Sequence, residues 1–264
     1  MKTQMISKFF FPAVLLLSMA GCHEPEPIWE EMKITDLKPA SGSGNSGKLK
    51  TVSFDVHKIE FAAGQLENLN KIYEDLQSSV ILLNSPAGFK KNLFRAGLGR
   101  EKAWRRLNRI YTEFGGEVIS SLSYLINLDQ PNYIPATFMD SQKDVFYYSS
   151  EDNLKGVTIG RGNLSFQITA SQIPDTKSFC RLSVVPAFPQ RNSGNPSVSE
   201  FDISDDVIFS SVGFHIRISP GDFILIGPRE YIPHQYTLPA VLFCSQKPEP
   251  VVRIFLILCK QINL

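Results

Sequence analysis

The spacing of apolar residues changes at Gly115 and Gly116, and this change constrains the fold more than any other feature of the sequence. Before this pair, apolar residues recur at intervals of three and four, and the stripe through Glu101 to Phe114 predicts an amphipathic helix. The glycine pair is typical of a helix end. From Glu117 onward the apolar runs are short, β-branched or aromatic, and separated by Gly, Pro, Asn or Asp, which predicts strands.

The region before the glycine pair combines one strand with helices. Thr51 to Phe61 alternates apolar and polar residues and predicts a strand, whereas Gln65 to Gln77 has helical spacing. Ser85 followed by Pro86 is typical of an N-cap and first helical turn, and we expect that short helix to end at Gly97.

The region after the glycine pair is predicted to be almost entirely strands and turns. Val251 to Cys259 is nearly continuous apolar sequence, as expected of a central strand covered on both faces. Gly160-Arg161-Gly162 is interpreted as a hairpin turn and Pro186 to Ser199 as an exposed loop. The predicted strands are Ile119 to Ile126, Val145 to Tyr148, Val157 to Ile159, Leu164 to Ile168, Ser178 to Val185, Val207 to Ile218, Phe223 to Ile226, Ala240 to Phe243 and Val251 to Lys260.

These patterns predict an α+β protein. A small N-terminal α/β unit with a basic amphipathic helix occupies residues 51–116, and a mainly antiparallel β-domain occupies residues 117–264. Residues 1–21 are predicted to be a signal peptide and residues 22–50 a flexible Gly/Ser tether, so both lie outside the fold.

The N-terminus carries the features of an export signal. Lys2 and Lys8 precede an apolar stretch that is too short to span a membrane with polar flanks. Met19-Ala20-Gly21-Cys22 resembles a bacterial lipobox, in which the cysteine receives lipid. We therefore expect Cys22 to be lipidated and to anchor the protein in the bacterial cell envelope, at the outer membrane and facing the periplasm. The alternative is a soluble exported protein, cleaved after Ser18-Met19-Ala20.

Composition excludes several classes of protein. A net charge of +1 gives no global argument for nucleic-acid binding, and four cysteines are too few for a disulfide framework. Cys180, Cys244 and Cys259 lie within apolar segments without CxxC spacing, so buried free thiols are the favoured interpretation over a disulfide.

No catalytic or metal-binding signature stands out. His57, His215 and His234 have no short metal-ligand spacing, and the sequence has no Gly-x-Ser-x-Gly elbow, since the Gly- and Ser-rich run Ser41 to Gly47 belongs to the predicted tether. We therefore name no catalytic residue, no metal site and no cofactor, and we lean against an enzyme. An exported hydrolase is the alternative. In such an enzyme, His215 or His234 would meet a carboxylate in a deep pocket.

One stretch of the chain is strongly basic. Between Lys90 and Arg109, Glu101 is the single acidic residue among eight basic ones. On the predicted helix the basic residues would face outward and could contact anionic lipid, acidic glycans or an acidic partner, although a solvated helix face is the common alternative. The candidate partner-binding residues are Lys102, Arg105, Arg106 and Arg109.

Two resemblances to known families complete the sequence evidence. The order of strand, basic helices and strands resembles uncharacterised exported proteins of planctomycete type, through the segments Leu66–Leu76, Leu93–Gly99 and Gly160–Leu164. The last hundred residues are similar to the β-module of bacterial secretins. That likeness is carried by Leu164 to Val185, Ser219 to Gly227, Leu238 to Phe243 and Val251 to Ile262.

The secretin likeness implies a related β-module in the C-terminal part. Together with the predicted anchor it favours a non-enzymatic binding or assembly module of the envelope, with an envelope protein as partner and no nucleic acid. Association with secretion or pilus machinery is one hypothesis that it raises. The alternatives are the exported hydrolase and a ring-forming, secretin-like outer-membrane component.

Overall fold

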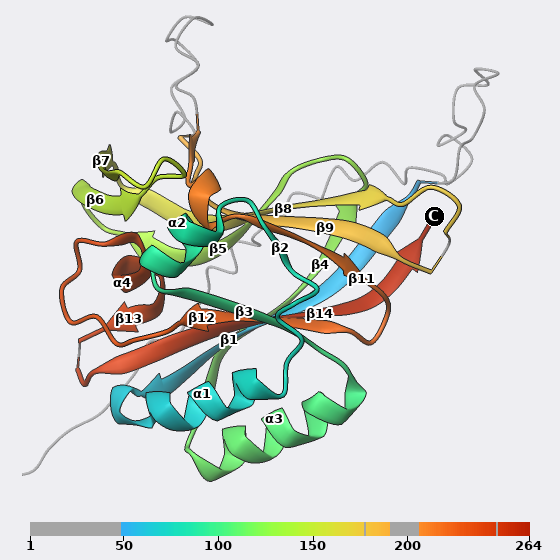
Figure 1. Ribbon diagram of the computed structural model, residues 1–264, viewed down its shortest axis with the longest axis horizontal. Coiled ribbons are helices and arrows are strands. Elements are labelled where there is room, and N and C mark those ends of the chain that lie inside the picture. The colour runs from blue at the N-terminus through green and yellow to red at the C-terminus, as the bar shows by residue number, and fades with distance from the viewer. Residues whose placement is uncertain (1–48, 177, 191–205, 247) are drawn as a thin grey trace, which may run out of the picture. The chain divides into compact units, whose positions relative to one another are not determined.

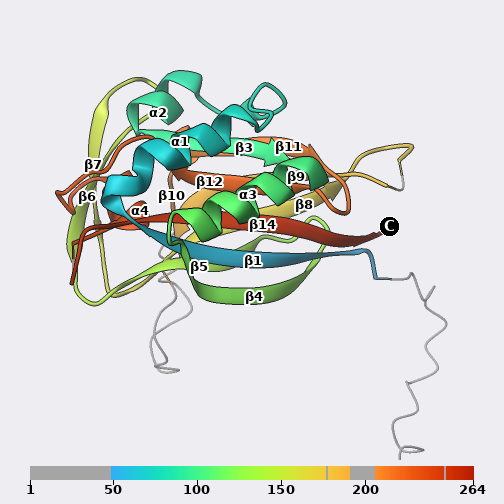
Figure 2. The same cartoon turned by 90° about the horizontal axis from the view of Figure 1, so that it is seen from below.

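Two antiparallel sheets pack face to face, and two helices cover the outer face of one sheet (Figures 1 and 2). The computed structural model describes residues 49–176, 178–190, 206–246 and 248–264. Within helix α3 the side chains of residues 101, 102 and 110 are not described. Cys22, the predicted signal peptide and most of the predicted tether lie outside the described residues. Residues 48–264 form one compact unit.

The first sheet, sheet A, holds the strands that carry the helices. Its central strand is β14, which is mostly buried from Val252 to Cys259, as the apolar run predicts. In order across the sheet the strands are β3 (Phe94–Gly99), β12 (Phe223–Pro228), β14 (Val251–Asn263), β1 (Thr51–Ala62) and β4 (Glu117–Asn127), with β13 (Cys244–Ser245) beside β14.

The second sheet, sheet B, lies against the inner face of sheet A, and a separate two-stranded ribbon lies between β5 and β8 in the chain, at one end of the sheets. Sheet B runs in the order β2 (Leu82–Leu83), β11 (Phe214–Ile218), β9 (Cys180–Phe188), β8 (Gly162–Gln172) and β5 (Asn132–Met139), with β10 (Val207–Ile208) beside β9. The ribbon consists of β6 (Lys143–Tyr148) and β7 (Leu154–Ile159). Every strand pair in the described part of the chain is antiparallel.

The helices are α1 (Leu66–Glu74), α2 (Pro86–Lys91), α3 (Glu101–Glu113) and α4 (Leu238–Phe243), with 3-10 turns at Ala63–Gln65 and Ser210–Val212. Ser85 caps α2 as predicted, since its Oγ accepts a hydrogen bond of 3.1 Å from the Gly88 N–H. The helix ends at Lys91 and not at Gly97, because Leu93 adopts a positive φ of 57° and the chain then enters β3.

Two strand predictions and one turn prediction were wrong in detail. Ala240 to Phe243 belongs to helix α4, whose six residues are all buried, and a short apolar run buried on every side has no period that distinguishes helix from strand. Val207 to Ile218 is interrupted by the turn at Ser210–Val212. Gly160 to Gly162 does turn the chain, but β7 and β8 lie in different sheets, so it does not close a hairpin.

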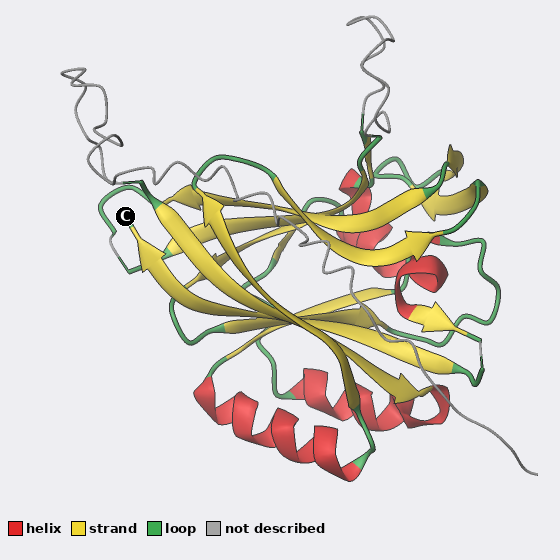
Figure 3. Ribbon diagram, turned by 180° about the vertical axis from the view of Figure 1, so that it is seen from behind, coloured by secondary structure: helices red, strands yellow, loops and turns green. Residues whose placement is uncertain are grey.

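Alternate residues of β1 face two different cores. Val52, Phe54 and Val56 are buried between the two sheets, whereas Ile59 and Phe61 are buried beneath the helices. Helices α1 and α3 cover only part of the outer face of sheet A, as Figure 3 shows from behind. Along β1, the outward positions change from polar to apolar where this cover begins.

The mainly antiparallel β fold is confirmed. The strand pairing does not show a separate N-terminal unit at residues 51–116. Strand β1 lies between β14 and β4, and β3 pairs with β12. Sheet A therefore combines strands from both predicted units. The two ends of the fold meet as well, since Thr51 is opposite Asn263 in the register.

Candidate binding surface on helix α3

Helix α3 packs on sheet A through the apolar stripe that the sequence predicts. Leu107 is 3% exposed, and Trp104 packs edge-on against Phe223 with ring centroids 5.7 Å apart. Tyr111 makes a similar contact with Phe61 at 6.4 Å. This stripe fixes the rotation of the helix, and so it decides which side chains point to solvent.

The four predicted binding residues do not form one uniform patch. Arg105, Arg106 and Arg109 are exposed, whereas the side chain of Lys102 is not described. Arg106 Nη1 donates a hydrogen bond of 2.5 Å to Asp75 Oδ1 just beyond α1, so this arginine ties the two helices together. Partner binding by these residues stays a prediction.

A small groove separates α3 from the strands beneath it. Its volume is about 210 Å³, and most of its lining is apolar or aromatic. Trp104 is 37% exposed at its rim. The lining residues are His57, Ile59, Trp104, Leu107, Asn108, Tyr111, Val118 and Leu256. We call this the α3 groove.

Arg105 and Arg109 lie beside the α3 groove. Each follows a groove-lining residue, Trp104 or Asn108, by one position, and successive residues are about 100° apart around a helix of 3.6 residues per turn. They therefore project from the solvent-facing side of α3 next to the groove. The α3 groove is therefore an apolar site with two positively charged side chains, Arg105 and Arg109, beside it.

A polar cluster on the outer face of β1 adjoins the groove at His57. Asp55 accepts a hydrogen bond of 2.6 Å from Ser123 Oγ, and Lys260 Nζ lies 3.4 Å from its other carboxylate oxygen. The Ser123 hydroxyl holds the pKa of Asp55 below its usual value, followed in effect by Lys260. Burial lowers the pKa of His57, so this imidazole is neutral at pH 7.

Sequence reasoning missed the part of the groove that the strands supply. The spacing of the histidines assigns no role to His57, and Val118 lies outside the predicted strand Ile119 to Ile126. The sequence does carry a signal. Along one face of the strand, Ser53, Asp55 and His57 are polar, and the next residue on that face, Ile59, is apolar. The change marks the edge of the helix cover, but only the register of β1 with β4 brings Val118 beside it.

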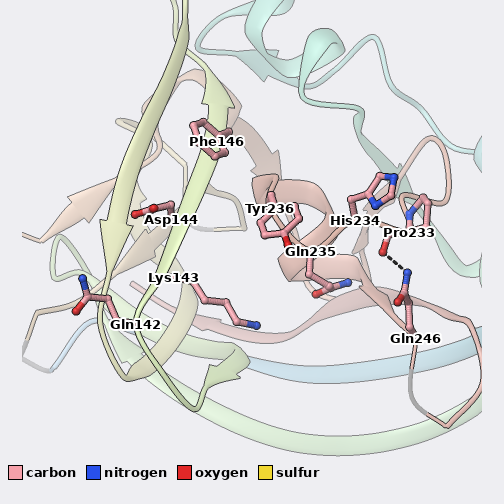
Figure 4. Close-up of a pocket in the computed structure, with 9 residues that line it drawn as sticks. All are labelled: Gln142, Lys143, Asp144, Phe146, Pro233, His234, Gln235, Tyr236 and Gln246. Atoms are coloured by element: carbon pink, nitrogen blue, oxygen red, sulfur yellow. Dashed lines mark hydrogen bonds between the residues drawn. The ribbon is translucent and has the colours of Figure 1, made fainter.

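A second, larger pocket of about 660 Å³ lies between α4 and the β6–β7 ribbon (Figure 4). It contains His234, which the hydrolase hypothesis would place against a carboxylate. Asp144 lies on the opposite side of the pocket and accepts a hydrogen bond of 2.6 Å from Thr158 Oγ1. His215 lies on β11 opposite Ser183 and not opposite an acidic residue. The described residues therefore bring neither histidine to a carboxylate.

The three cysteines in the described part of the chain are free and buried, as predicted. Burial raises the pKa of Cys180 to about 11 and that of Cys259 to about 12, so both thiols are protonated and unreactive at neutral pH. Within the same residues, no group of three His, Cys, Asp or Glu side chains could hold a metal ion. None of the described helices is long and apolar enough to cross a membrane.

Comparison with protein-family models finds no match, and comparison with curated proteins finds none. Two solved structures are similar to this chain, and both are secretins. One is the secretin-domain β-barrel of InvG from the Salmonella SPI-1 injectisome, at 12% identity and a TM-score of 0.25, covering 81% of this chain and 63% of that one. The other is the V. cholerae type IV competence pilus secretin PilQ, at 9% identity and a TM-score of 0.27, covering 82% and 61%.

The chain spans less than two thirds of the length of either secretin structure. The neighbours belong to the family that the C-terminal segments resemble, at a similarity too low to transfer a fold or a function. The resemblance to planctomycete exported proteins is matched by no family model.

Proposed function

We propose that the protein is a non-enzymatic binding module of the bacterial cell envelope, held at the outer membrane by lipid on Cys22 and facing the periplasm. The export signal and lipobox-like residues support the anchor. The compact unit from residue 48 onward supports a folded domain carried on a tether. Cys22 itself lies outside the described residues.

The α3 groove with its arginine flank is the observation that carries the binding role. A volume of about 210 Å³ lies below the roughly 300–1,000 Å³ that is typical of small-molecule sites. The groove therefore suits a protruding apolar side chain of a partner protein better than a whole ligand. Arg105 and Arg109 beside it favour acidic residues flanking that side chain. The proposed partner is an envelope protein that presents an acidic segment with an apolar anchor.

Charge reversal on the flank tests this role. The variant Arg105→Glu/Arg109→Glu should lose a partner that co-purifies with the full chain from the native envelope. Two reversed rim charges at ~1 kcal/mol each predict about a 30-fold weaker affinity. Quantitative mass spectrometry of the purified complex, followed by a binding titration with the partner so found, measures the loss.

The matched control is Arg161→Glu/Arg181→Glu, which makes the same charge change at exposed arginines outside α3. It should keep the partner. If both double variants recover equal amounts of the partner, the arginines of α3 are part of an ordinary solvated helix face and the proposed binding role is wrong. The identity of the partner decides whether the protein works beside secretion or pilus machinery, and detergent-resistant multimers on a gel would instead favour the ring-forming alternative.

The anchor is tested separately. Replacing Cys22→Ser removes the only thiol of the lipobox-like segment, so the protein should leave the membrane fraction for the soluble periplasmic fraction. If the Cys22→Ser protein stays in the membrane fraction after a high-salt wash, the lipid anchor is refuted. That result would leave the proposed binding role of the α3 groove unaffected.

A further inference from the structure

Strand β4 forms an open edge of sheet A. It is eleven residues long and pairs with β1 on one side; no other described strand pairs with it. An edge strand presents unpaired backbone N–H and C=O groups to its free side, and such a row is a ready template for another strand. Its single charged residue is Glu117 at the first position, and it contains no proline.

The other end strands of sheets A and B in the described residues are protected. Strand β2 has two residues. The backbone of β3 is met at Leu98 by Gln77, through hydrogen bonds of 2.9 and 3.2 Å. Strand β5 is broken by Pro135 and a bulge that follows it. These are usual devices that prevent edge-to-edge pairing. Strand β4 is long and contains no proline, and its bulge lies at Ile119, near the start of the strand.

Four large apolar side chains are exposed along β4. Leu122 is 52% exposed and Leu125 is 70% exposed, and Val118 and Ile119 are exposed as well. Apolar exposure concentrated on one open strand marks an interaction site rather than the scattered exposure of an ordinary surface.

The sequence of β4 is close to symmetric about Leu122. Serines flank it at positions 121 and 123, Ile119 mirrors Leu125, and Val118 mirrors Ile126. If two copies of the strand meet antiparallel with Leu122 opposite Leu122, each residue faces its mirror residue in the other copy. Ile119, which the register shift leaves without a partner on β1, would lie across from Leu125.

We propose that the β4 edge is a dimer interface, in which two copies of this chain pair through β4 about a two-fold axis at Leu122. The pairing joins the two copies of sheet A into one continuous sheet and satisfies both open edges. It is isologous, so it closes at two copies.

Charge and side-chain orientation fit this partner. Glu117 comes to lie opposite Asn127, so no like charges face each other across the two strands. The register with β1 puts Leu122 on the inner face with Val56, and Ser121, Ser123 and Leu125 on the outer face with His57, Asp55 and Ser53. From Ser120 to Tyr124 the mirror pairing keeps inner residues with inner and outer with outer. Beyond the bulge at Ile119 the faces no longer match, since Val118 lies on the outer face with Ile59 and its mirror residue Ile126 on the inner face with Val52. The proposed interface shares Val118 with the lining of the α3 groove, and its centre at Leu122 lies outside that lining.

Cysteine crosslinking in the native envelope tests the register. In the full chain, Leu122→Cys should form a covalent dimer under mild oxidation by copper phenanthroline, because directly opposed Cβ atoms are about 5 Å apart. Leu125→Cys alone should not, since its own copy is offset by six residues, or ~20 Å. The double variant Ile119→Cys/Leu125→Cys should crosslink again. The wild-type chain supplies the background, because Cys180, Cys244 and Cys259 are buried.

Leu154→Cys is the collision control, since Leu154 is exposed on β7, away from the proposed interface. Non-reducing gels read out each variant. Crosslinking by Leu125→Cys or Leu154→Cys as strong as by Leu122→Cys overturns the proposal, and so does a Leu122→Cys chain that stays monomeric or crosslinks to a different protein.

A disrupting variant provides the second measurement. Leu122→Lys would place two like charges opposite each other, so the detergent-extracted full chain should shift from dimer to monomer in light scattering after gel filtration. Leu154→Lys makes the same change elsewhere and should stay dimeric. A wild-type chain that is monomeric at the highest concentration measured also overturns the proposal.

Discussion

At the scale of single residues, the half-buried Tyr73 carries an unusual buried hydroxyl. Its ring lies under the Arg95 guanidinium, which is 5.0 Å from the ring centre. Its hydroxyl is buried and has no hydrogen-bond partner among the described residues. Burial raises the pKa of this phenol, so the group is neutral at every ordinary pH. A buried hydroxyl without a hydrogen-bond partner lowers the free energy of unfolding by its desolvation cost, whereas burial of the apolar ring has no such cost.

The variant Tyr73→Phe is therefore expected to raise the free energy of unfolding by about 1 kcal/mol, because it removes the desolvated hydroxyl and keeps the ring. Tyr111→Phe is the matched control. The Tyr111 hydroxyl accepts a hydrogen bond of 3.3 Å from the Val118 N–H, so its loss should lower stability. Urea unfolding of both variants measures the difference, and equal losses would show that Tyr73 has a partner.

At the scale of elements, glycines let β3 lie close to the segment after α1 and to Phe223 on the neighbouring strand β12. A Cβ added at Gly97 would lie 2.5 Å from the Cβ of Leu76 in the segment after α1. One added at Gly99 would lie 2.1 Å from Phe223 Cζ. Phe223 is fully buried and Trp104 packs on its ring, so it has little room to move. These contacts explain why Phe94–Gly99 forms a strand, although the sequence predicts a helix that ends at Gly97.

Replacing Gly99→Ala should therefore destabilise the fold by about 1–3 kcal/mol, as overpacking of a buried site does. The indole of Trp104 sits on Phe223, so its fluorescence should also shift. Gly64→Ala is the control, because nothing lies within 4 Å of the added Cβ. A Gly99→Ala variant as stable as this control would mean that the Phe223 ring has space beside it.

At the scale of the whole molecule, the first and last strands of the fold lie together in sheet A. Strand β1 pairs along its whole length with β14, and β14 also pairs with β12. The core between the sheets draws on both, through Phe54 and Phe255. Residues 51–116 and 117–264 therefore depend on each other for burial.

A chain of residues 117–264 alone is expected not to fold, because it lacks β1 and β3 and leaves β14 and β12 each with one open side. Residues 48–264 are the positive control. Circular dichroism and urea titration compare the two. Cooperative unfolding of residues 117–264 would instead support the separate β-domain that the sequence predicts.

Local sequence predicted those features that local chemistry determines. The helices α1 and α3, the Ser85 cap, the central position of β14 and the burial of the three cysteines all follow from spacing, caps and apolar runs. The structure of α4 and β3 could not be predicted in this way, because burial on all sides removes the period from a short segment.

The sequence by itself determined the β-rich class and the basic side of α3, because each follows from local patterns of residues, and it predicts an export signal. Only the tertiary structure decided that one sheet takes strands from both ends of the chain, that Val118 and His57 meet α3 in one groove, and that β4 is left as an open edge. The reason is physical. Strand pairing joins residues such as Thr51 and Asn263 that are far apart in sequence, and register is set by the fit of the whole core.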